Sequence, residues 1–132
     1  MTDVEKLLDA RILIVDDSSL VRLYYRDALQ KAGCEVEQAI NGIEAMEKVL
    51  AQKFDLVIVD VNMPRMDGFS FLRALRRGAP DVATLPALVI TTEADAQDID
   101  DARAAGGNFY LIKPISQPDL LRHVAVLTGA PT

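Results

Sequence analysis

The fold is decided by residues 55–60, DLVIVD, in which four apolar residues stand between two aspartates. Branched apolar side chains favour β-strands, and a strand that is apolar on both faces has to be covered on both faces. Besides this strand, expected over 55–59, two similar runs are RILIV at 11–15 and ALVI at 87–90. Together the three runs predict a central parallel sheet with helices on both sides.

Two further segments complete the predicted sheet. Residues 35–39, EVEQA, suit an edge strand, because the charge of the two glutamates discourages pairing with a second molecule. Residues 108–112, NFYLI, give a fifth strand. Since each strand leads into a segment with helical spacing, the chain is expected to alternate strands with helices.

Helix boundaries are predicted from capping residues and glycines. The first helix is expected over 19–32, the second after Asn41, the third from Asp67-Gly68 to Gly78, a weaker one over 94–105, and the last from Ser116. Apolar spacing places on the inward faces Leu20, Tyr24, Ala28 and Ala32 of the first helix and Ala45, Met46, Val49 and Leu50 of the second.

Charge and composition exclude several classes of partner. The 132 residues include 14 Lys and Arg against 20 Asp and Glu, so the formal net charge of -6 repels nucleic acids and anionic membranes. The single cysteine, Cys34, cannot form an internal disulfide and is expected to be a small buried side chain. Because no apolar run approaches a membrane span and the N-terminus is acidic, we expect a cytoplasmic protein.

Polar side chains follow the predicted strands, where ligands bind in sheets of this type. Asp16 and Asp17 follow the first strand, Asp60 the third, Thr91 the fourth and Lys113 the fifth. Clustered carboxylates repel one another unless a cation lies among them, and oxygen ligands without His or Cys suit Mg²⁺. The cluster therefore predicts a Mg²⁺ site where Asp60 accepts a phosphoryl group that Lys113 and Thr91 contact.

The motifs at these positions resemble those of the response regulator receiver domains. They are, in order, ILIVDDSS (12–19), VIVDVNMPRMDG (57–68), VITTEA (89–94) and YLIKP (110–114), and the resemblance covers nearly all of the chain. It implies a flavodoxin-like, doubly wound, five-stranded parallel sheet with the strand order 2-1-3-4-5 and helices on both faces.

The resemblance also implies a role for each site residue. A histidine kinase would phosphorylate Asp60, Mg²⁺ would be held by Asp17, by Asp60 and by the Asn62 backbone carbonyl, and Asp16 would hold a metal-bound water. Thr91 and Lys113 would contact the phosphoryl group, and the bond between Lys113 and Pro114 would be cis.

The same resemblance implies how the signal leaves the site. Thr91 would move toward the phosphoryl group and Tyr110 would turn inward, which changes a face made by the helix over 94–105, the strand over 108–112 and the last helix. Asn62 and Glu93 would tune the hydrolysis of the phosphoryl group.

Plainer explanations stand beside these roles. The Asp16-Asp17 pair alone would suit a helix cap, Lys113 a solvated lysine and Tyr110 a packed sheet residue. His123 is expected to be structural or solvated. A solvated helix face is expected for Arg65, Arg73, Arg76 and Arg77.

We expect residues 1–132 to form one receiver domain, with a core over about 10–128, that acts as a monomer and catalyses only its own phosphorylation and dephosphorylation. The segments VNMPRMDG and ITTEA resemble the chemotaxis members, which implies a flagellar motor switch target or a phosphate sink. A receiver fragment of a larger regulator is an open alternative. A haloacid dehalogenase phosphatase would need an acid where Asn62 stands, and Asp16 and Asp17 would repel the phosphate of a flavodoxin cofactor.

Overall fold

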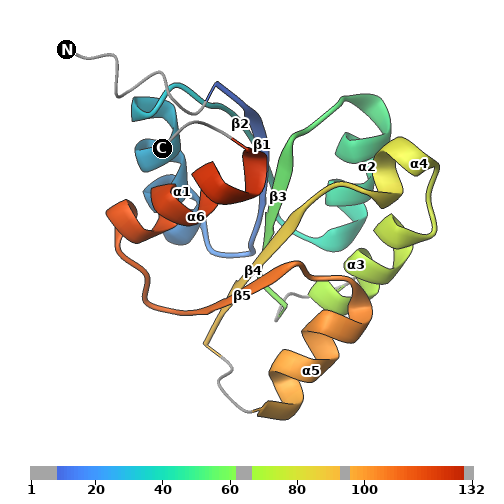
Figure 1. The fold of residues 1–132 in the computed structure, drawn as a ribbon. Coiled ribbons are helices and arrows are strands. Elements are labelled where there is room, and N and C mark those ends of the chain that lie inside the picture. The colour runs from blue at the N-terminus through green and yellow to red at the C-terminus, as the bar shows by residue number, and fades with distance from the viewer. Residues whose placement is uncertain (1–8, 62–66, 93–95, 130–132) are drawn as a thin grey trace.

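A computed structural model describes residues 9–61, 67–92 and 96–129 of the chain. Within these residues five parallel strands form one sheet in the order β2-β1-β3-β4-β5 (Figure 1). This confirms the flavodoxin-like topology. The strands are β1 (Arg11–Val15), β2 (Glu35–Ala39), β3 (Leu56–Val59), β4 (Ala87–Thr91) and β5 (Phe109–Ile112).

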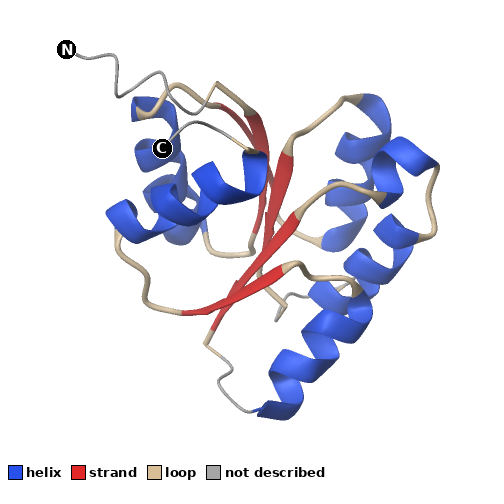
Figure 2. Cartoon of the chain, viewed as in Figure 1, coloured by secondary structure: helices blue, strands red, loops and turns tan. Residues whose placement is uncertain are grey.

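The sheet is covered by helices on both faces, as the strand composition predicts. Helices α1 and α6 lie on one face, and α2, α3 and α5 lie on the other (Figures 1 and 2). The described helices are α1 (Ser19–Lys31), α2 (Gly42–Ala51), α3 (Gly68–Arg76), α4 (Pro80–Ala83), α5 (Ala96–Ala105) and α6 (Gln117–Thr128).

Alternation along the central strands divides the core into two clusters. On β1, Leu13 faces the cluster under α2, α3 and α5, whereas Ile12 and Ile14 face the cluster under α1 and α6. The same alternation on β3 sends Val57 and Ile58 to opposite sides. The sheet is therefore buried on both faces. The polar residues that follow the strands lie at the carboxyl end of this buried sheet.

The capping residues begin their helices as predicted. The Asn41 Oδ1 atom accepts a hydrogen bond from the Glu44 backbone N at 2.8 Å, and Asp67 Oδ1 accepts one from Ser70 N at 2.7 Å. Ser116 Oγ accepts one from Asp119 N at 3.2 Å. The short helix α4 was not predicted; its first residue is Pro80, which suits the first helical position.

Two predicted inward faces are wrong in part. Leu20 is 77% exposed and Tyr24 is 43% exposed, and Tyr25 and Leu29 are buried in their place, whereas Ala28 and Ala32 are buried as predicted. Successive helical residues point about 100° apart, so an error of one residue turns the predicted face away from the sheet. For the same reason Leu50 is exposed while its neighbour Val49 is buried.

Arg76 also differs from its predicted solvated position. Its guanidinium donates hydrogen bonds to the carbonyl oxygens of Ala83 (2.9 Å), Leu85 (2.6 Å) and Gly106 (2.6 Å from Nη2), and to Asn108 Oδ1 (2.9 Å). Burial lowers the pKa of this guanidinium. Arg76 thus ties α3 to the loops before β4 and β5.

Candidate functional site

The carboxyl ends of β1 and β3 bring three aspartates together. One carboxylate oxygen from each of Asp16, Asp17 and Asp60 lies within 4.8 Å of the others. Asp16 and Asp60 are buried, with 2% and 7% of their surface exposed, and Asp17 is exposed. The structure therefore places these predicted residues in one cluster that opens to solvent on the Asp17 side.

Sheet hydrogen bonds hold the backbone of the two buried aspartates. The Asp16 backbone N donates to the Ala39 carbonyl oxygen at 3.1 Å, and the Asp60 N donates to the Val15 carbonyl oxygen at 2.9 Å. Both residues thus continue the ladder by one position beyond the apolar run of their strand. Their side chains therefore project from the end of the hydrogen-bonded sheet.

Lys113, which follows β5, joins the cluster. Its Nζ atom lies 3.0 Å from Asp16 Oδ2 and 3.7 Å from Asp60 Oδ2. The second Asp16 oxygen, Oδ1, accepts a hydrogen bond from the Ser18 backbone N at 2.9 Å. Among the described residues, three carboxylates face one ammonium here, and such an excess of carboxylates attracts a cation.

Thr91 is fully buried at the end of β4, where it pairs with Ile112 of β5. Its carbonyl oxygen accepts a hydrogen bond from the Lys113 backbone N at 2.7 Å. The following peptide bond, between Lys113 and Pro114, is cis. Thr91 and Lys113 are thereby linked at the same edge of the sheet.

Tyr110 lies on β5, opposite Val89, and its partly buried side chain packs against the core cluster under α2, α3 and α5. It borders a cavity of about 40 Å³ that Ile99 and Ala102 of α5 also line. Asn62 and Glu93, the other predicted site residues, lie outside the described residues.

Gly68, at the start of α3, is required by the path of the chain near Asp60. A Cβ atom on Gly68 would lie 2.5 Å from the Asp60 carbonyl oxygen and 2.5 Å from the Val61 Cα, which is closer than atoms can approach. Its backbone N donates to the Val61 carbonyl oxygen at 3.1 Å. The Asp-Gly pair predicts a turn, but the sequence does not predict this close approach to the site.

Tyr25 is a site neighbour that the sequence did not predict. Burial, and then the negative charges of Asp16 and Asp60, raise the pKa of its phenol. The predicted face of α1 placed Tyr24 inward instead, because two adjacent tyrosines fit the apolar spacing almost equally well.

An apolar groove adjoins the cluster on the side of Lys113. It has a volume of about 410 Å³. Within it the Tyr24 hydroxyl donates to the Ile115 carbonyl oxygen at 3.0 Å. The groove is lined by Leu20, Val21, Tyr24, Tyr25, Lys113, Pro114 and Ile115.

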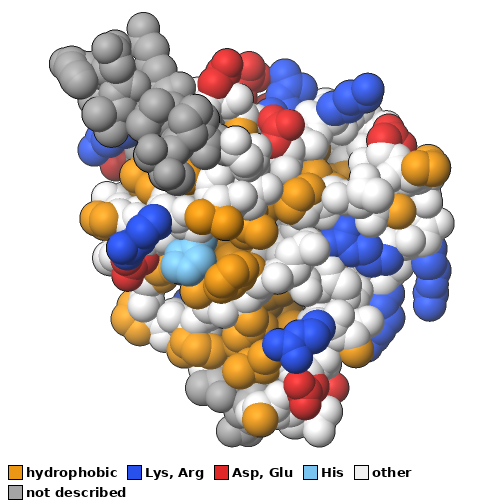
Figure 3. All heavy atoms as spheres, in the orientation of Figure 1, with side chains coloured by type: hydrophobic (Ala, Val, Ile, Leu, Met, Phe, Trp, Pro, Cys, Tyr) orange, Lys and Arg blue, Asp and Glu red, His pale blue; other side chains and the backbone are white. Residues whose placement is uncertain are grey.

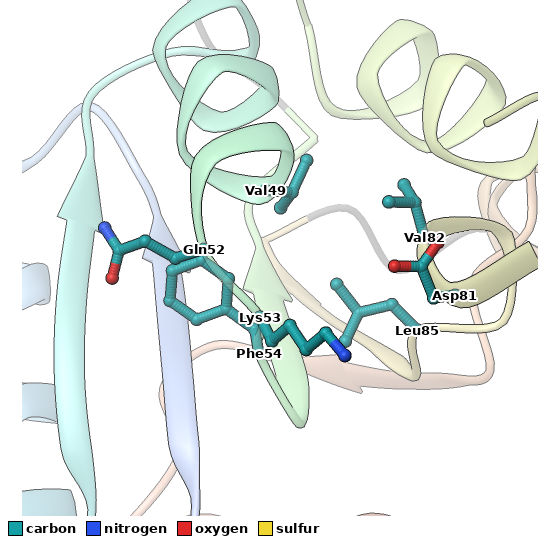
Figure 4. Close-up of a pocket in the computed structure, with 7 residues that line it drawn as sticks. All are labelled: Val49, Gln52, Lys53, Phe54, Asp81, Val82 and Leu85. Atoms are coloured by element: carbon teal, nitrogen blue, oxygen red, sulfur yellow. The ribbon is translucent and has the colours of Figure 1, made fainter. Parts of the chain in front are cut away.

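A different cavity, of about 80 Å³, lies between α2, α4 and the start of β3 (Figure 4). Lys53 and Asp81 are its charged lining residues, and apolar side chains such as Phe54 and Leu85 form much of the wall. Since Lys53 precedes β3 and Asp60 follows it, this cavity lies at the opposite end of the strand from the aspartates.

Comparisons with family models, curated proteins and solved structures all point to the same family. The model of the response regulator receiver domain matches residues 12–125. Sensor protein EvgS of Escherichia coli (strain K12) is 38% identical over 116 residues, which are 88% of this chain and 9% of that protein. The gliding motility regulatory protein of Myxococcus xanthus is 38% identical over 103 residues, 78% of this chain and 13% of that protein. The chain thus spans about a tenth of the length of these relatives.

Two solved structures illustrate the structural likeness. Chemotaxis response regulator CheY4 of Vibrio cholerae superposes with a TM-score of 0.84 at 38% identity and covers 89% of this chain and 98% of that one. The receiver domain of sensor histidine kinase PA1611 from Pseudomonas aeruginosa has a TM-score of 0.84 at 27% identity, over 92% and 98% of the two chains. That structure has a magnesium ion coordinated in its active site cleft.

Proposed function

Because the chain belongs to the family of response regulator receiver domains, which pair with histidine kinases in two-component systems, we propose that Asp60 is its phosphoryl acceptor. The observation that carries this proposal is the cluster of Asp16, Asp17 and Asp60 beside Lys113 at the carboxyl edge of the sheet. The negative charge at this edge suits a metal ion, and the Lys113 ammonium suits a phosphoryl group.

The donor set fits Mg²⁺. Three carboxylates offer hard oxygen ligands close enough together to share one small cation, and the exposed side of the cluster leaves room for water ligands. Asp17 and Asp60 would hold the ion directly and Asp16 through a water, with the Asn62 carbonyl as a further ligand. When bound, Mg²⁺ supplies positive charge that offsets the carboxylates and orients phosphoryl oxygens. The magnesium ion in the PA1611 receiver domain supports this assignment.

In the proposed transfer, an Asp60 carboxylate oxygen attacks the phosphorus of a phosphohistidine. The phosphorus–nitrogen bond breaks as the phosphorus–oxygen bond forms, which leaves an acyl phosphate on Asp60 and a histidine that takes up a proton. Lys113, 3.7 Å from Asp60 Oδ2, is placed to pair with a phosphoryl oxygen, and Thr91 would contact another.

The groove beside Lys113 supports delivery of the phosphoryl group by a protein donor. Leu20 and Tyr24 expose apolar surface there, directly next to a site residue. Exposed apolar surface of this kind marks protein contact sites. The kinase would therefore approach along α1 and the segment after β5.

The proposed output face consists of α5, β5 and α6. Phe109 and Ile112 of β5 are 43% and 39% exposed, and the His123 ring of α6 lies 5.1 Å from the Phe109 ring. Figure 3 shows hydrophobic side chains gathered over β5 and α6 on this side of the molecule. Phosphorylation would act through Thr91 and Tyr110, which occupy neighbouring strands beneath this face.

A chemotaxis output to a flagellar motor switch protein is supported by the likeness to CheY4, whereas the likeness to part of EvgS supports a receiver unit within a larger protein.

We propose that the domain is a monomer and lies in the cytoplasm. Within the described part of the chain, no helix is long and apolar enough to cross a membrane. A phosphate sink differs from both other outputs because its phosphorylated form needs no target.

Phosphorylation by acetyl phosphate tests the proposal. With Mg²⁺ present, intact-mass spectrometry should detect one added phosphoryl group on the wild type and none on Asp60→Asn. Asp81→Asn, on the exposed surface of α4, is the matched control and should be phosphorylated like the wild type. An Asp60→Asn protein that gains the group to the same extent would contradict the assignment.

A further inference from the structure

Arg22, in the first turn of α1, reaches back to the aspartate cluster. Its Nη1 atom donates a hydrogen bond to the Asp16 carbonyl oxygen at 2.7 Å. Its Nε atom donates to Gln38 Oε1 at 2.9 Å. Gln38 belongs to β2, where it pairs with Ile14 of β1, so both ends of this contact are anchored in the sheet.

The carbonyl that Arg22 holds belongs to the peptide bond between Asp16 and Asp17. The other polar atoms of Asp16 are already fixed: its N by Ala39, its Oδ1 by Ser18 and its Oδ2 by Lys113. Asp17 is different. Among the described residues, no hydrogen bond to the Asp17 carboxylate is found, so the position from which it reaches the cluster is set by the backbone that carries it.

We propose that Arg22 is a positioning residue for the metal site. By fixing the plane of the Asp16–Asp17 peptide, Arg22 aims the exposed Asp17 carboxylate at the two buried ones. Gln38 supports this role, because its hydrogen bond holds the Arg22 guanidinium in the orientation that reaches the Asp16 carbonyl oxygen. The inference rests on the proposed function, since it concerns the same Mg²⁺ site.

Charge and position predict opposite effects at this residue. The Arg22 guanidinium is a positive charge close to the cluster, and by charge alone its removal would strengthen the binding of a divalent cation. If Arg22 positions Asp17, its removal must weaken that binding. The sign of the change in Mg²⁺ affinity therefore separates the two effects.

The test is isothermal titration calorimetry with Mg²⁺ alone on the unphosphorylated protein. Arg22→Gln removes the charge and the fork of donors, whereas Arg22→Lys keeps the charge but replaces the fork with one ammonium that cannot reproduce both contacts. We expect both variants to bind Mg²⁺ about tenfold more weakly than the wild type. Arg26→Gln, one turn further along α1, controls for charge on the same helix and should not weaken binding.

Gln38→Leu provides a test that leaves Arg22 in place and guards against misfolding of the Arg22 variants. It removes the acceptor of the Nε atom, and we expect Mg²⁺ binding that is weaker than in the wild type but tighter than in the Arg22 variants. Unchanged or tighter binding by either Arg22 variant, or unchanged binding by Gln38→Leu, would overturn the inference while the proposed function stands. A wild type that does not bind Mg²⁺ would overturn both.

Discussion

At the residue scale, the site depends on Lys113 being shared between two acids. Its ammonium lies closer to Asp16 than to Asp60, with distances of 3.0 Å and 3.7 Å. A phosphoryl group on Asp60 would bring new negative charge to the weaker of these two contacts. The Lys113 backbone N donates a hydrogen bond to the Thr91 carbonyl oxygen, so a movement of one residue displaces the other.

Replacement of Lys113 should therefore separate phosphorylation from its consequence. Lys113→Ala should still accept a phosphoryl group from acetyl phosphate. Without the ammonium, however, the phosphoryl group has no contact through which to displace the end of β5. Two-dimensional NMR should show phosphorylation-induced shifts on α5, β5 and α6 in the wild type, and these shifts should be largely lost in the variant. Lys53→Ala, at the opposite end of β3, is the control and should keep them. Full shifts in phosphorylated Lys113→Ala would refute the role of the lysine.

Cys34 provides a pH-dependent prediction. Burial raises the pKa of its thiol from 9.0 to about 11, so the folded protein keeps the neutral thiol at pH values where the unfolded chain has lost the proton. Its contribution to stability is full below pH 9 and falls between about pH 9 and pH 11. The loss in the free energy of unfolding should be about 1–3 kcal/mol, measured by urea denaturation. Cys34→Ala should show a smaller decline over this range, and an identical decline would contradict the assignment.

At the element scale, α3 starts so close to β3 that only glycine fits at its first position. Gly68→Ala would bring a methyl group against the Asp60 and Val61 backbone. We expect a loss of about 1–3 kcal/mol in the free energy of unfolding and slower phosphorylation, because the backbone that carries Asp60 has to shift. Ser70→Ala, in the same helix, is the control. A Gly68→Ala protein with wild-type stability and phosphorylation rate would disprove this constraint.

Elements differ in how much of them the sequence could predict. The strands β1, β3 and β4 were predictable because their apolar runs are continuous, and the aspartates were predictable as a cluster because the carboxyl ends of parallel strands share one edge. The face of α1 was not, because Leu20, Tyr24 and Tyr25 offer competing apolar stripes and only packing on the sheet selects Tyr25. Arg22 was missed for a related reason: its partners lie in β2 and in the turn after β1.

At the scale of the whole molecule, Arg76 connects parts of the chain that the sequence keeps apart. Its acceptors are backbone carbonyls near α4 and after α5, together with Asn108, which also accepts a hydrogen bond from the Ala87 backbone N at 2.8 Å. Carbonyl groups are present at every residue, so no sequence pattern reveals such a network. The network joins α3 to the segments that follow α4 and α5.

Removal of this network should be costly. Arg76→Met keeps much of the side-chain length but leaves the partly buried carbonyl groups without their donor, and we expect a loss of about 2–4 kcal/mol in the free energy of unfolding. Arg73→Met, one turn earlier on the exposed side of α3, should change it little. Chemical denaturation measures both, and an Arg76→Met protein as stable as Arg73→Met would contradict the structural role.

The proposed function depends on which residue carries the phosphoryl group. Borohydride reduces an aspartyl phosphate to homoserine, so treatment of the protein after incubation with acetyl phosphate and Mg²⁺, followed by peptide mass spectrometry, locates the modified position. We expect homoserine at Asp60 and at no other aspartate, with a yield that depends on Mg²⁺. Modification at Asp16 or Asp17 in place of Asp60, or an equal yield without a divalent cation, would contradict it.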